Sequence, residues 1–122
     1  MLVLVGFVLL ALAFTYPQWL RLGTELVAPS EDPQLNRWIL AWDAHALLTQ
    51  PARLFDANIF YPYPYSLAYS ENLLGSALLG LPLQLLLNNP TATYGILNLF
   101  SFALCGFGAY LLGRRVSGRA CG

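Results

Sequence analysis

The stretch "APSEDPQLNRWILAWDAHALL", residues 28–48, decides how the chain is organised, because here charge returns after a long apolar run. Two adjacent carboxylates, Glu31 and Asp32, stand before Pro33, and proline is favoured in the first turn of a helix. Because aspartate is a good N-cap, the sequence predicts a helix over residues 33–49 with Asp32 as its cap. The two carboxylates therefore serve as a cap, as an acidic site, or as both.

The helix predicted at residues 33–49 has an amphipathic pattern. Its apolar residues recur at spacings of three and four positions, as on one face of an α-helix: they are Leu35, Trp38, Ile39, Trp42, Ala46 and Leu47. Arg37, Asp43 and His45 interrupt this apolar surface. Since short helices with tryptophans on an apolar face lie well at membrane surfaces, we expect an interfacial helix here.

The composition of the whole chain is typical of a membrane protein. Of its 122 residues, 57% are hydrophobic and only 10% are charged, and the mean hydropathy is +0.57. A soluble domain carries about 25% charged residues. The formal net charge is zero, so the charge balance gives no reason to expect a nucleic-acid partner. Membrane lipids are the expected surroundings.

Residues 1–20 contain no charge, and about 20 apolar residues are enough to cross a hydrocarbon core of about 30 Å. Tyr16 and Trp19 lie at the far end of this run, where interfacial aromatic residues belong. A signal peptide is the alternative, but it would carry basic residues before its apolar run, and none precedes Arg21. We therefore predict a transmembrane helix over residues 1–21.

A second uncharged run, residues 72–113, is long enough for two helices, and the Asn-Asn-Pro sequence at residues 88–90 divides it. The first piece predicts an interfacial helix over residues 71–87. Ser70 is its expected cap, and Glu71 in the first turn would favour the helix dipole.

Residues 91–113 predict the second transmembrane helix. The arginines that follow, in residues 114–122, should be cytoplasmic by the positive-inside rule. We therefore predict an all-α integral membrane chain in which residues 22–90 form an extracytoplasmic loop between two spans. Three full spans are the alternative. We expect residues 1–122 to be a single, partial membrane domain of a longer protein.

The stretch "NIFYPYPYSLAYSE", residues 58–71, is the richest in tyrosine. Pro62 and Pro64 exclude a regular helix, so we predict an extended aromatic loop close to the lipid headgroups. Tyr61 and Tyr63 are candidates for stacking on a sugar, and anchoring in the membrane interface explains them equally well.

These features together resemble the N-terminal part of a GT-C superfamily membrane glycosyltransferase, of the mannosyltransferase-like and YfhO-like type. The features are "SEDPQLNRW" after an apolar helix, the amphipathic helix, the proline–tyrosine loop, and a return span ending in "GRRVSGR". The resemblance implies an enzyme of the cytoplasmic membrane that transfers a sugar from a polyprenyl-phosphate donor to an extracytoplasmic acceptor. Because family members have many more spans, it also implies that this portion alone is inactive.

The resemblance assigns the catalytic carboxylate to Asp32 first and to Glu31 second. Such a carboxylate acts as a general base toward the acceptor. Alternatively, Asp32 holds a divalent cation, Mg²⁺ or Mn²⁺, that steadies the departing phosphate. The sequence leaves both possibilities open.

Four further residues are candidates for substrate binding. Arg37 and Arg53 suit a donor phosphate, with lipid headgroups as the alternative partner. Asp43 and His45 sit in the same predicted helix and are weaker candidates. A rival reading from another class is a non-catalytic membrane protein, such as a transporter or an assembly subunit for a cell-envelope polysaccharide. A small complete two-span scaffold is a third reading.

Overall fold

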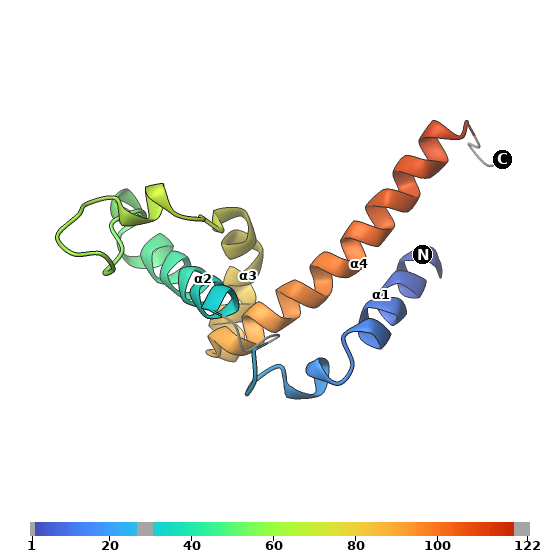
Figure 1. The fold of residues 1–122 in the computed structure, drawn as a ribbon, viewed down its shortest axis with the longest axis horizontal. Coiled ribbons are helices and arrows are strands. Elements are labelled where there is room, and N and C mark those ends of the chain that lie inside the picture. The colour runs from blue at the N-terminus through green and yellow to red at the C-terminus, as the bar shows by residue number, and fades with distance from the viewer. Residues whose placement is uncertain (1, 27–30, 119–122) are drawn as a thin grey trace.

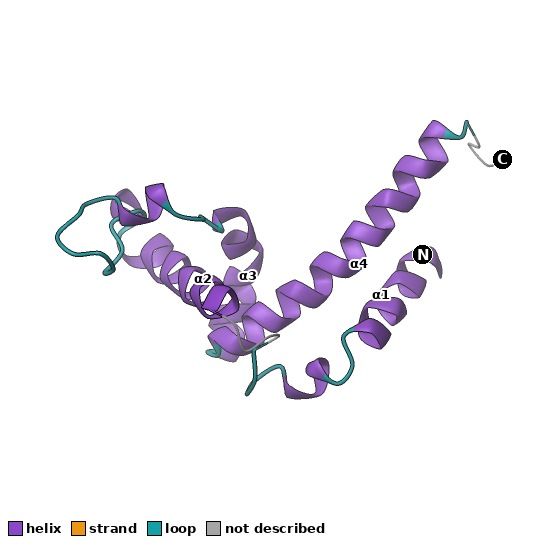
Figure 2. Ribbon diagram, in the orientation of Figure 1, coloured by secondary structure: helices purple, strands orange, loops and turns teal. Residues whose placement is uncertain are grey.

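The computed structural model describes residues 2–26 and 31–118, and it is all-helical over these residues (Figures 1 and 2). The elements are α1 (Leu2–Phe14), η1 (Gln18–Arg21), α2 (Glu31–Thr49), η2 (Pro51–Arg53), η3 (Ser66–Tyr69), α3 (Leu74–Leu87) and α4 (Pro90–Val116), where η marks a short 3₁₀ helix. The described part of the chain contains no strand, which confirms the predicted all-α class.

Within the described residues, α4 is the one helix long and apolar enough to cross a membrane. Its 27 residues measure about 40 Å, more than a hydrocarbon core of about 30 Å. The helix begins at Pro90 because the Asn89 side chain accepts hydrogen bonds from the backbone N–H groups of Thr91 and Ala92, at 3.0 and 3.1 Å. The predicted start of this helix, residue 91, thus lies one residue after the observed start at Pro90.

The first apolar helix is shorter than the predicted span over residues 1–21. Helix α1 ends at Phe14, so its 13 residues cover only about 20 Å. The reason is local: Pro17 has no backbone N–H to continue the helix, and proline disfavours helical geometry at the preceding residue. The chain turns there and continues as η1.

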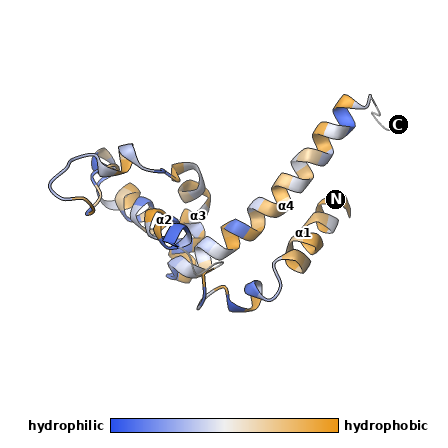
Figure 3. Cartoon of the chain, viewed as in Figure 1, coloured by the Kyte–Doolittle hydropathy of each residue, from blue (hydrophilic) through white to orange (hydrophobic). Residues whose placement is uncertain are grey.

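Helix α1 lies beside the C-terminal half of α4, with the first turn of α1 and the last turn of α4 on the same side of the molecule (Figure 1). Figure 3 shows that both helices are mainly apolar. Gly106 permits the close approach, because a Cβ added there would lie 2.5 Å from Cδ1 of Phe7. The Phe7 ring also contacts Tyr110, with 6.5 Å between the ring centroids.

We expect Gly106→Val to loosen the contact between α1 and α4, because the new side chain must displace the Phe7 ring. Overpacking of this kind costs about 1–3 kcal/mol. Gly108→Val is the matched control, since a Cβ at Gly108 meets nothing within 4 Å. Both variants replace glycine by valine within α4, so they change the intrinsic helix propensity by the same amount. Thermal unfolding of both variants in detergent micelles, followed by circular dichroism, measures the difference. Equal melting temperatures would show that Gly106 is not a packing position.

A second unit forms where α2 packs on α3 and on the first turns of α4. Its core contains Ile39, Ala57 and Leu67, with Trp38, Trp42, Ile59 and Leu73 packed around them. The indole Nε1 of Trp42 donates a 2.9 Å hydrogen bond to the carbonyl oxygen of Leu54. Helix α2 is therefore held by protein on several sides, which its predicted role as a surface helix did not anticipate.

Helix α3 begins three residues later than the predicted range of 71–87. The side chain of Asn72 accepts a 2.9 Å hydrogen bond from the backbone N–H of Leu74, so Asn72, and not Ser70, assists the start of the helix. At the other end, Asn88 has φ 47° and closes α3 in the left-handed region. The predicted turn between α3 and α4 is thus present, and the two helices form a hairpin.

Candidate functional site

The aromatic loop, which we define as residues 54–73, is pinned at its base by three hydrogen bonds that join residues 55–57 to residues 65–67. The backbone N–H of Leu67 donates to the carbonyl oxygen of Phe55 at 3.1 Å. The backbone N–H of Tyr65 donates to Oδ1 of Asp56 at 2.8 Å, and Oγ of Ser66 donates to the carbonyl oxygen of Ala57 at 3.2 Å. These bonds close the segment between them into a compact loop with a defined shape.

Two bulky residues of this loop adopt left-handed backbone geometry. Phe60 has φ 56° and Tyr65 has φ 57°. Non-glycine residues rarely adopt this region, and each such residue costs on the order of 1–3 kcal/mol. Asp56 supports one of them directly, because its carboxylate accepts the hydrogen bond from Tyr65. Strain of this kind persists where surrounding contacts enforce it, and it is concentrated at functional sites.

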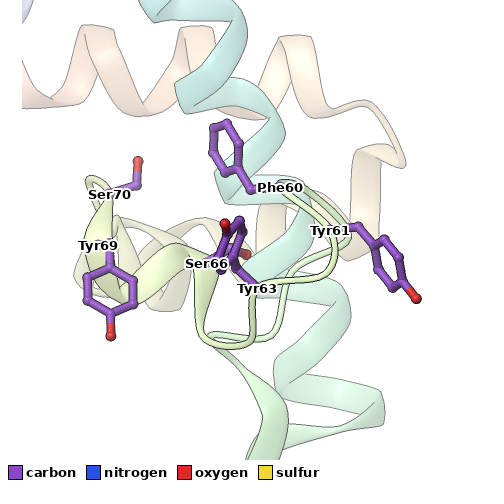
Figure 4. Close-up of a pocket in the computed structure, with 6 residues that line it drawn as sticks. All are labelled: Phe60, Tyr61, Tyr63, Ser66, Tyr69 and Ser70. Carbon is purple, nitrogen blue, oxygen red and sulfur yellow. The ribbon is translucent and has the colours of Figure 1, made fainter.

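The aromatic loop borders a shallow, open cavity of about 560 Å³. Its lining consists of four aromatic residues and two serines: Phe60, Tyr61, Tyr63, Ser66, Tyr69 and Ser70. Figure 4 shows Tyr61 and Tyr69 on opposite sides of the group, with Phe60, Tyr63 and Ser66 between them. None of the lining residues is charged. We call this space the aromatic cavity.

The chemistry of the aromatic cavity suits a neutral, ring-shaped ligand with hydroxyl groups. Its volume lies in the range of small-molecule sites, about 300–1,000 Å³. Aromatic faces are electron-rich and attract polarised C–H groups, and the phenol and serine hydroxyls donate and accept hydrogen bonds. The sequence indicated Tyr61 and Tyr63 and missed the other four. The clustering of tyrosines at positions 61, 63, 65 and 69 was a signal for Tyr69, although it pointed equally to Tyr65, which does not line the cavity, and the serines carried no signal.

The carboxylates proposed as catalytic lie elsewhere, at the start of α2. The helix begins at Glu31, so Asp32 is its second residue and belongs to the first turn, where the prediction had made it the N-cap. Both side chains are exposed, and negative charge in a first turn favours the helix dipole. Neither residue lines the aromatic cavity.

Arg37 is the half-buried cation closest to these carboxylates in sequence. Its Nη1 donates a 3.3 Å hydrogen bond to Oγ1 of Thr91, in the first turn of α4. Within the described residues the one ion pair joins Arg21 to Glu25, so Arg37 has no carboxylate partner there. Its guanidinium thus retains donors for an anion. Arg53 lies exposed in η2, and the structure does not bring it to Arg37.

His45 is exposed in the second half of α2. Its ring stands 5.9 Å from the Trp42 ring, centroid to centroid, and its Nε2 is 3.3 Å from Oγ1 of Thr49. It borders a smaller cavity of about 210 Å³ between α2 and α3. Neither of the tyrosines predicted to bind substrate lines that space.

Asp43 differs from the other candidates because its side chain is 0% exposed. Neither carboxylate oxygen has a hydrogen-bond partner in the described part of the chain. Burial without a compensating partner raises the pKa of Asp43 from 3.8 to about 6. A substrate cannot reach this carboxyl unless α2 and its neighbours separate.

A divalent cation at Asp32 is compatible with the residue type. Among the residues described, no group of three or more His, Cys, Asp or Glu side chains is placed to hold a metal. However, Mg²⁺ is commonly held by one or two carboxylates together with substrate phosphate and water. The exposed carboxylate of Asp32 can supply the protein's share of such a site.

Comparison with known proteins adds no family to this description. No protein-family model, curated protein or solved structure matches the chain significantly. The functional argument therefore rests on the residues of the site itself.

Proposed function

We propose that this chain is part of a membrane glycosyltransferase that handles a lipid-linked sugar at the extracytoplasmic surface. The observation that carries the proposal is the aromatic cavity, because uncharged aromatic and hydroxyl groups match a sugar ring better than a charged metabolite. Strained, hydrogen-bonded closure of the loop supports a binding role, since it holds the lining residues in place before a ligand arrives.

The proposed topology has two crossings, one by α1 with the segment that follows it and one by α4. Three observations support it. The first turn of α1 and the C-terminal end of α4 lie on the same side (Figure 1), both helices are largely apolar (Figure 3), and Arg114 and Arg115 occupy the last turn of α4. In this proposal that end is cytoplasmic, as the positive-inside rule favours, and α2, α3 and the aromatic loop lie on the opposite side.

In the proposed mechanism the aromatic cavity captures the sugar of the donor, and the transfer itself takes place at Asp32, which does not line the cavity. There Asp32 accepts the proton of the acceptor hydroxyl or amine as this group attacks the anomeric carbon of the donor. The bond from the anomeric carbon to the phosphate oxygen breaks, and its electron pair leaves with the polyprenyl phosphate. Arg37 is suited to hold that phosphate by charge-assisted hydrogen bonds. If a divalent cation takes part, Asp32 would be its protein ligand, and the cation would neutralise charge on the leaving group.

Tyr63→Ala tests the aromatic cavity in the complete protein in lipid nanodiscs, supplied with polyprenyl-phosphate-linked hexoses one at a time. Loss of one stacking surface should raise KM about two- to tenfold, because an aromatic contact contributes about 0.5–1.5 kcal/mol. Tyr63→Phe should retain most of the affinity. Tyr16→Ala is the matched control, since this exposed tyrosine lies outside the aromatic loop.

A KM unchanged by Tyr63→Ala would remove the aromatic cavity from sugar binding. Equal losses of membrane insertion in the Tyr63 and Tyr16 variants would instead identify both as interfacial anchors. Saturable binding of the lipid-linked sugar without any transfer would favour the non-catalytic alternative.

A further inference from the structure

Asp43 lies on the most tightly packed face of α2. The residues three and four positions away share this face, and those at 39, 40 and 46 are all buried. Asn36, two turns earlier on the same face, also has a buried Oδ1 without a partner. This face thus presents buried oxygen acceptors without partners, in a position where an ionised carboxylate would be strongly penalised.

No described charge compensates Asp43. Helix α3 has no ionisable side chain, and the first three turns of α4 contribute only Tyr94. The remaining ionisable residues of α2 and the adjoining segment through Glu71 are Glu31, Asp32, Arg37, His45, Arg53, Asp56, Tyr61, Tyr63, Tyr65, Tyr69 and Glu71. None of them forms an ion pair or hydrogen bond with Asp43 among the residues described.

The same segment of α2 holds the aromatic loop. Ile39, one turn before Asp43, packs on Ala57 and Leu67, and the neighbouring Trp42 donates its hydrogen bond to the carbonyl oxygen of Leu54. Because Ile39 and Asp43 lie one turn apart on the same face of α2, water that reaches an ionised Asp43 from the side of the aromatic loop must open this packing. Ionisation of Asp43 is therefore coupled to the contacts that anchor the aromatic loop on α2.

We propose that Asp43 is a proton-binding site that controls how tightly the aromatic loop packs on α2. With the proton bound, the carboxyl is neutral and the closed packing is stable. When the proton leaves, the carboxylate draws water inward and the loop loosens, which changes the shape of the aromatic cavity. This site does not depend on sugar transfer, because it rests on the burial and contacts of α2.

The direction of the pH dependence follows from the pKa of Asp43. In the closed packing this pKa is raised to about 6, whereas a solvated carboxyl in the loosened state titrates near 4. The closed state therefore binds the proton more tightly. The stabilisation of the closed state by the bound proton is fully present below about pH 4 and is lost as the pH rises through about 6.

Hydrogen exchange of residues 54–73 in the complete protein in nanodiscs, measured from pH 4.5 to 7.5, tests the proposal. We compare the wild type with Asp43→Asn at each pH, so that the intrinsic pH dependence of exchange cancels. The exchange rate of the wild type, divided by that of Asp43→Asn, should rise about tenfold or more from pH 4.5 to 7.5. The reason is that the pKa of Asp43 differs by about two units between the closed and the loosened state. Glu71→Gln, which removes an exposed carboxylate, should behave as the wild type.

A constant ratio between the wild type and Asp43→Asn would overturn the proposal, and so would loss of the pH dependence in Glu71→Gln. If Asp43→Asn does not fold, ¹³C NMR titration of the Asp43 carboxyl in the wild type decides the matter. A midpoint near 6 supports the proton site, and a midpoint near 4 overturns it.

Discussion

Replacing Ile39 by alanine is expected to destabilise the unit formed by α2, α3 and the aromatic loop by about 2–5 kcal/mol. The Ile39 side chain is 0% exposed and stands at the centre of the small core with Ala57 and Leu67. Truncation leaves a cavity, and Ala57 has too little side chain to fill it. Because few buried residues hold the aromatic loop, this loss is a large share of the local stability.

Leu35→Ala is the matched control for Ile39→Ala. Leu35 stands one turn earlier in the same helix, and its side chain is 39% exposed. Denaturant unfolding followed by tryptophan fluorescence suits the comparison, because Trp38 and Trp42 border the core. If Leu35→Ala lowers the free energy of unfolding as much as Ile39→Ala does, the core assigned to α2 is incorrect.

The second large expected effect is on catalysis. Asp32→Asn in the complete protein should lower kcat for sugar transfer by about 10²- to 10⁴-fold, the usual contribution of a positioned general base. Asparagine has nearly the same shape and is tolerated at a helix start, so the fold of α2 should be retained. Transfer from a polyprenyl-phosphate-linked hexose in nanodiscs is the measurement, with circular dichroism as the check on folding.

Two comparisons sharpen the test of Asp32. Glu71→Gln removes a different exposed carboxylate and should leave kcat unchanged. Raising the concentration of Mg²⁺ or Mn²⁺ should partly restore Asp32→Asn if the carboxylate holds a cation, and should not restore it if the carboxylate is a base. Full activity of Asp32→Asn would exclude both roles.

Local sequence signals predicted the helical elements well. The α2 helix, the loop around Pro62 and Pro64, and the turn at Asn88 all follow from spacing or backbone chemistry within a few residues. Errors occurred at helix ends. The first helix stops at Phe14 because of the proline three residues later, although the apolar run continues to residue 20.

The candidate site was predictable only in part. Tyr61 and Tyr63 were chosen for their side-chain chemistry, and they do line one cavity. Their partner Ser66 joins them because the loop folds back and its hydroxyl bonds to Ala57, a contact between residues nine positions apart. Non-local contacts of this kind leave no periodic pattern in the sequence.

The sequence by itself determined the all-α class, the apolar character of α4 and the break at residues 88–90, because each depends on neighbouring residues or on composition. The tertiary structure decided which side of α2 is buried. From spacing alone, Asp43 interrupts an apolar surface, and Trp38 and Trp42 are as well suited to the buried core as Ile39 is. In the folded chain α2 packs against α3 and α4, and Asp43 is completely buried. The physical reason is that burial depends on which surfaces meet, and a single helix does not specify its partners.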